Sequence, residues 1–187
     1  QPTGPSPGPP KAALGSGALP ADFLAQPHSA SLLRPVCVTL VMCSPRLFAQ
    51  VCPGTNRYVG SALWIAALEP AVRFWRRGNV YSAMVAGIEL EPEHGLEWEE
   101  AARIALEGAE DLCSRGIIPI YSLVWPVGGR TRSDFHARIR SYFETLNSGS
   151  HGIRQRHGLT VSEGFLFHRC AYIHLQCDLD RTESRTA

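Results

Sequence analysis

The sequence lacks the features that would direct a protein to a membrane or a polyanion. No apolar run reaches the roughly 18 residues needed to span a bilayer, and residues 1–10 have neither the basic nor the apolar segment of a signal peptide. Lys11 is the only lysine and the formal net charge is +1, so no charge excess favours nucleic acid or anionic lipid. These absences predict a cytoplasmic protein with no nucleic-acid and no membrane partner.

The cysteines are scattered along the chain. A chain of 187 residues is long enough for one hydrophobic core and does not need disulfides to hold it together. Cytoplasmic thiols or metal ligands are therefore the favoured interpretation of the six cysteines. They are Cys37, Cys43, Cys52, Cys113, Cys170 and Cys177.

Residues 1–30 are rich in Pro, Gly and Ala without periodicity, which predicts a disordered segment. Beyond them, apolar β-branched runs at 36–43, 80–88 and 117–125 predict buried strands. Helical patterns separate and follow these strands at 61–77, 96–115 and from 133 or 134 to 146. Pro70 predicts that the first of these helices is kinked or split in two. Asn147 to Ser150 predict a break after the third. The fold class is therefore α/β, built of parallel βαβ units with right-handed crossovers.

The ends of the second and third predicted strands carry motifs that resemble the radical S-adenosylmethionine (SAM) superfamily. Residues 84–89, Met-Val-Ala-Gly-Ile-Glu, match the core of its loose G-x-I-x-G-x-x-E motif, with Ala83 in place of the first glycine and the acid one position early. Residues 116–119, Gly-Ile-Ile-Pro, and 125–128, Trp-Pro-Val-Gly, match its sixth barrel strand.

This resemblance implies that residues 31–147 form the back part of a partial (β/α) TIM-type barrel that binds SAM. It assigns an adenine-side wall to Val85, Gly87, Glu89, Val124, Trp125 and Pro126. The intact family carries out 5′-deoxyadenosyl-radical chemistry on a small-molecule substrate and uses a [4Fe–4S] cluster.

The cluster motif C-x3-C-x2-C is missing from this sequence, and residues 39–43 carry no carboxylate for the ribose and methionine part of SAM. We therefore expect a truncated protein, a fragment or a relic, which cannot cleave SAM unless a partner chain or an N-terminal half supplies the rest. No catalytic residue is assigned.

Residues 148–187 form a predicted C-terminal tail with cluster-like spacing, Cys170-x3-His174-x2-Cys177, and His168 two residues before it. Thiolates and imidazoles at this spacing are typical of an auxiliary iron–sulfur or structural zinc site, with Cys52 as a potential fourth ligand. The alternative is that both cysteines are buried and the histidines lie at the surface. The second function is accordingly a non-catalytic α/β module with a structural metal in its tail.

Two loops offer further polar groups. Glu89, Glu91, Glu93 and His94 follow a strand end, where acid–base residues commonly stand, or they form a solvated loop that favours the next helix N-terminus. Residues 128–130, Gly-Gly-Arg, predict either an anion-binding loop or a plain connection. An ordinary nucleotide-binding domain would need a phosphate-cradling glycine loop, and residues 128–129 are its only candidate.

Overall fold

The computed structural model describes residues 12–16, 33–41, 44–91, 94–124 and 134–161. It shows an α/β protein with a parallel sheet in which the strands lie in the order β1-β2-β3-β4. The strands are β1 (Ala12–Ser16), β2 (Leu33–Val41), β3 (Val80–Ala86) and β4 (Ile117–Leu123). The helices are α2 (Pro45–Val51), α3 (Pro53–Tyr58), α4 (Ser61–Trp75), α5 (Trp98–Ser114) and α6 (Phe135–Arg156), with a 3₁₀ turn η1 (Ile88–Leu90).

Strands β3 and β4 form the centre of the fold, as their apolar sequences predict. They pair in unbroken parallel register from Val80 opposite Ile117 to Ala86 opposite Leu123. Most side chains of both strands are buried, which explains why neither strand alternates apolar with polar residues. Their carboxyl ends meet at one rim of the sheet, where η1 begins.

Among the described strands, β4 lies at one end of the sheet. Its backbone N–H and C=O groups point alternately toward β3 and toward the opposite side. The N–H of Val124, just past the strand, donates to Ala86 O at 2.9 Å. Even-numbered residues of β4 therefore direct their backbone groups toward β3, because these directions alternate along a strand. Pro119, in the odd-numbered set, has its nitrogen on the side away from β3, where it breaks no ladder hydrogen bond.

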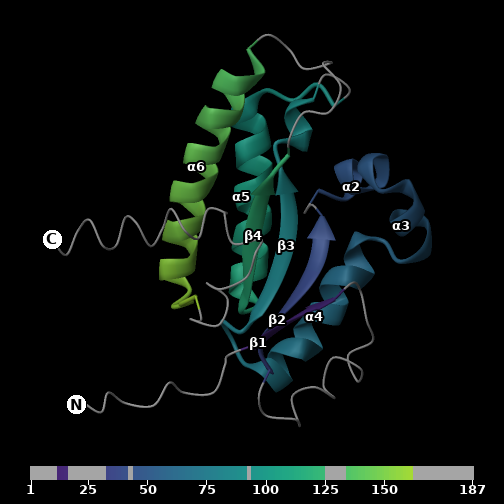
Figure 1. The fold of residues 1–187 in the computed structure, drawn as a ribbon, viewed down its shortest axis with the longest axis vertical. Coiled ribbons are helices and arrows are strands. Elements are labelled where there is room, and N and C mark those ends of the chain that lie inside the picture. The colour runs from purple at the N-terminus through teal and green to yellow at the C-terminus, as the bar shows by residue number, and fades with distance from the viewer. Residues whose placement is uncertain (1–11, 17–32, 42–43, 92–93, 125–133, 162–187) are drawn as a thin grey trace, which may run out of the picture.

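The core has two parts, one for each face of the sheet. The larger cluster joins apolar residues of α4 and α5 to β3 and β4 side chains such as Val80, Met84 and Tyr121. The smaller cluster joins Tyr81 and Ile118 on the other face to the end of α6. Helices α4 and α5 therefore pack on the same face, and Figure 1 shows α6 lying alongside α5.

Helix α6 runs from Phe135 to Arg156, so the break expected at residues 147–150 is wrong. A Cβ at Gly149 would lie 2.5 Å from Leu106 Cδ2 of α5, and the Ser150 side chain is fully buried. Close packing of α5 against α6 thus stabilises a segment with weak intrinsic helix propensity.

Two other predictions are corrected near the N-terminus. The expectation of disorder over residues 1–30 is wrong for Ala12–Ser16, which pair with β2 as a fourth parallel strand. Pairing with an existing strand stabilises a segment whose own sequence carries no strand signal. Pro70 does not divide α4 either, because the helix runs unbroken from Ser61 to Trp75.

The predicted α/β class and parallel βαβ pairing are confirmed. Within the described ranges, no helix combines the length and apolar composition needed to cross a membrane.

Candidate functional site

Gly87 lies where β3 ends, and its conformation excludes other residues. Its φ is +98°, and a Cβ there would lie 2.6 Å from Ile139 Cδ1 of α6 and 3.3 Å from Val124 Cγ1. Both the left-handed backbone and the contact with Ile139 therefore require glycine. In this structure the space above Gly87 is filled by α6.

Glu89 is a buried carboxyl group on η1, with 6% of its surface exposed. Its Oε2 accepts a hydrogen bond from the Gly87 N–H at 2.9 Å, and its Oε1 accepts one from the Tyr142 hydroxyl at 3.2 Å. Burial raises the pKa of Glu89 above its ordinary value, although these hydrogen bonds oppose the rise. A carboxyl group of this kind can hold or release a proton nearer neutral pH than an exposed one.

Arg138 of α6 fixes the loop that follows Glu89. Its guanidinium is almost fully buried and donates to Leu90 O at 3.4 Å and to Leu96 O at 2.7 Å. It also contacts Glu97 Oε2 at 3.2 Å. Arg138 and Tyr142 lie one helical turn apart, so one face of α6 holds both η1 and the start of α5.

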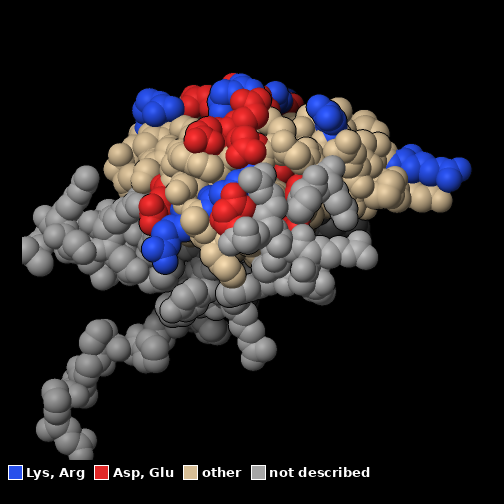
Figure 2. All heavy atoms as spheres, turned by 90° about the horizontal axis from the view of Figure 1, so that it is seen from above, with Lys and Arg blue, Asp and Glu red and all other residues tan. Residues whose placement is uncertain are grey.

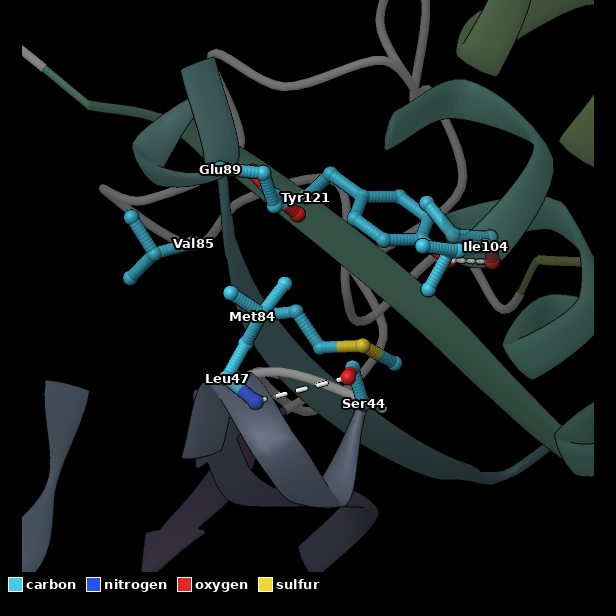
Figure 3. A pocket seen from close by; sticks show the side chains of 8 residues that line it. Ser44, Leu47, Met84, Val85, Glu89, Ile104 and Tyr121 are labelled. Atoms are coloured by element: carbon cyan, nitrogen blue, oxygen red, sulfur yellow. Dashed lines mark hydrogen bonds between the residues drawn. The ribbon is translucent and has the colours of Figure 1, made fainter. Parts of the chain in front are cut away.

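A hollow of about 270 Å³, part of it open to solvent, lies beside the Glu89 carboxyl group. Its lining comes from the loop after β2, from α2, β3, η1, α5 and β4: Ser44, Leu47, Met84, Val85, Glu89, Ile104, Ala105 and Tyr121. Figure 3 shows Glu89 and Tyr121 close together, with Val85 to one side. The Tyr121 hydroxyl donates to Ala105 O at 3.2 Å, so it faces α5.

Much of this volume is open solvent, and the enclosed part has room for about one water molecule, far less than the roughly 300–1,000 Å³ typical of small-molecule pockets. Its walls are mostly apolar, and Glu89 is its charged lining residue. The hollow is therefore too small for a whole ligand and suits at most one end of a ligand that extends over the strand ends.

The structure brings together four of the residues predicted for the adenine-side wall. Val124 lies beside Gly87, because its N–H donates to Ala86 O and a Cβ at Gly87 would lie 3.3 Å from its Cγ1. Val85 lines the same hollow as Glu89. Glu91 and His94 are half-buried in the loop after η1, where the His94 N–H donates to Glu91 O at 2.9 Å. Most other predicted site residues lie outside the described part of the chain: Trp125, Pro126, His168, Cys170, His174 and Cys177, together with Glu93 and residues 128–130.

Cys52, considered as a fourth metal ligand, lies between α2 and α3. Burial raises the pKa of its thiol, which disfavours the thiolate that binds metal. Burial also raises the pKa of Cys113 to about 12. Among the described residues, no group of three or more His, Cys, Asp or Glu side chains is placed to hold a metal ion, so these residues do not fit an iron–sulfur cluster.

Two α6 residues that complete this site, Arg138 and Tyr142, were not predicted from the sequence. Tyr142 belongs to the apolar pattern of the helix predicted to end at residue 146, and that pattern does not distinguish a hydroxyl with a buried acceptor from one in solvent. An arginine four residues before an inward-facing tyrosine was the available signal, because both would face the core on one side of the helix.

Comparison with family models, curated proteins and solved structures found no match to this chain.

Proposed function

We propose that this chain is the back part of a SAM-binding (β/α) barrel related to radical SAM enzymes. In this proposal the ends of β3 and β4 hold the adenine of SAM, and the chain alone does not cleave the sulfonium. A missing N-terminal half or a partner chain would supply the cluster and the remaining strands. The proposal includes a small-molecule substrate and a cytoplasmic location, which the free thiols of Cys52 and Cys113 support.

The observation that carries the proposal is the convergence of Val85, Gly87, Glu89 and Val124 at the carboxyl ends of a parallel sheet with sequential strand order. Ligands bind at this end of parallel β/α folds because the loops converge there. Sequential order is also the order of strands in a (β/α) barrel.

The described residues fit SAM in part. Val85 and Val124 offer apolar contacts for an adenine ring, whereas both Glu89 oxygens already accept hydrogen bonds from within the protein. We therefore assign Glu89 to holding the Gly87 amide and η1 in place rather than to direct contact with the ligand. Since the described residues do not fit the cluster, no chemical step is assigned to it.

Equilibrium dialysis with radiolabelled SAM tests the binding. We expect saturable binding that S-adenosylhomocysteine displaces and that Val124→Asp weakens by about tenfold or more, because a carboxylate would replace an apolar contact. The matched control is Leu123→Asp, the preceding residue, whose side chain is 39% exposed and should leave binding unchanged.

Absence of saturable SAM binding, or equal loss in both variants, would reject the proposal. Equal displacement by ATP and by S-adenosylhomocysteine would indicate a general nucleotide site instead. Formation of 5′-deoxyadenosine after anaerobic reconstitution of the chain with iron and sulfide would contradict the proposal that the chain alone does not cleave SAM.

A further inference from the structure

Helix α4 is apolar on more sides than the sheet covers. Its only polar residues are Ser61, Glu69 and Arg73. One side packs into the core through Trp64, Leu68, Ala71 and Trp75. A helix that is apolar almost all round is usually covered on more than one side.

A second apolar stripe lies along one flank of α4. Leu63, Ala67, Pro70 and Phe74 are spaced i, i+4, i+7 and i+11, which places them on one side of the helix over about 16 Å. The end residues are exposed, Leu63 by 66% and Phe74 by 41%. Tyr58, at the end of the preceding helix α3, is 82% exposed.

The stripe faces away from the neighbouring helix α5. Glu69 pairs with Arg115, at the C-terminal end of α5, and Glu69 lies about 120° round the helix from Leu63. None of the described segments covers Leu63, Phe74 or Tyr58.

Arginines stand at both ends of this stripe. Arg57 lies on α3 beside Tyr58, and Arg73 and Arg76 lie beside Phe74. All three are exposed, and none forms an ion pair within the described part of the chain. Figure 2 shows Lys or Arg side chains without acidic neighbours at the right-hand end, where Figure 1 places α3.

Three arginines elsewhere on the surface differ from these. Arg103, Arg115 and Arg156 each pair with a carboxylate of the fold, whereas Arg140 of α6 is exposed and has no ion pair among the described residues. Between residues 44 and 79 the only acidic residue is Glu69, which is itself paired. The α3–α4 side therefore carries an excess of positive charge that the fold does not neutralise.

We propose that this surface, defined by Arg57, Tyr58, Leu63, Arg73, Phe74 and Arg76, binds an acidic amphipathic helix of a partner protein. A straight apolar stripe of about three turns fits the apolar face of another helix. The arginines at both ends fit carboxylates that flank such a face, and exposed Tyr and Arg are the residue types that contribute most to interfaces. A bilayer would instead need a broad apolar face, and here only one flank of α4 is available.

Fluorescence anisotropy with a labelled synthetic helix tests the surface. The probe is an acidic 18-residue peptide with leucines at i, i+4, i+7 and i+11 and glutamates on its other faces, and a scrambled peptide of the same composition is the control. We expect the ordered peptide to bind and the double variant Leu63→Ser/Phe74→Ser to lose about tenfold or more in affinity. Leu123→Ser removes an exposed leucine elsewhere and should bind as the wild type does.

The contribution of charge is tested separately with the double variant Arg57→Glu/Arg73→Glu, which should weaken binding of the ordered peptide. The control is Arg140→Glu, which changes an exposed arginine of α6 and should leave binding unchanged. Equal binding of the scrambled peptide, or no effect of Leu63→Ser/Phe74→Ser, would overturn the proposal. Binding to phosphatidylserine vesicles that Leu63→Ser/Phe74→Ser abolishes would also overturn the proposal, because a membrane would then cover the stripe. A dimer in sedimentation equilibrium that the same double variant abolishes would overturn it too, because a second copy of the chain would then cover the stripe. Circular dichroism checks that each variant is folded.

Discussion

Replacing Gly87 by alanine tests whether this residue is required by the packing of α6. The backbone φ of +98° costs an L-residue about 1–2 kcal/mol. The added methyl group would meet Ile139 Cδ1 at 2.6 Å, and overpacking of this kind costs about 1–3 kcal/mol. We expect Gly87→Ala to lower the free energy of unfolding by about 2–5 kcal/mol, a large share of the about 5–15 kcal/mol typical of a domain.

Two further variants separate the backbone cost from the packing cost. Gly95 has a φ of +66°, and a Cβ there would meet nothing within 4 Å, so Gly95→Ala should cost only the backbone term of about 1–2 kcal/mol. The double variant Gly87→Ala/Ile139→Ala removes Ile139 Cδ1, the atom that the new methyl group would meet. It should be more stable than the sum of its single variants predicts, by about 1–3 kcal/mol.

Urea denaturation followed by circular dichroism measures all four variants, provided that the m-values agree. The packing explanation is refuted if Gly87→Ala costs no more than Gly95→Ala, or if Gly87→Ala and Ile139→Ala are simply additive. If Gly87→Ala left stability unchanged but abolished SAM binding, the glycine would instead serve the approach of a ligand.

Three other predictions follow from the site and the tail. Because burial raises the pKa of Glu89 above 4.5, its contribution to stability should be full below that pH and fall as pH rises through the folded-state pKa. Glu89→Gln should remove this fall in urea denaturation from about pH 4 to about pH 8, whereas the exposed control Glu99→Gln should keep it. Tyr142→Phe removes a donor to the carboxyl group and should cost about 1 kcal/mol and steepen the fall; an unchanged profile would contradict the hydrogen bond. Metal analysis should find iron or zinc in the wild-type protein and less in Cys170→Ser and Cys177→Ser; no metal in any of them would reject the tail site.

The central strands were predictable because strands that are buried on both faces have continuous apolar runs in their sequences. The length of α6 was not, because its continuation past Asn147 depends on the contact between Gly149 and Leu106, residues far apart in the chain. Strand β1 was missed for the same reason, since its pairing with β2 supplies what its local sequence lacks.

The sequence predicted where the candidate site lies but not which residues pack around it. The predicted strand ends indicated Gly87 and Glu89, but the sequence could not show that α6 packs over them. As a result, Ile139 rather than a ligand explains the glycine, and Tyr142 is one of the two hydrogen-bond donors to the carboxyl group.

Pro119 has a consequence for how far this sheet can grow. A strand that approached the outer side of β4 would meet a ladder with one donor missing near its middle, because the proline nitrogen faces that side and carries no hydrogen. Natural sheets use proline in this position to discourage unplanned edge-to-edge association. The outer side of β4 is thus poorly suited to recruit a further strand from a partner chain.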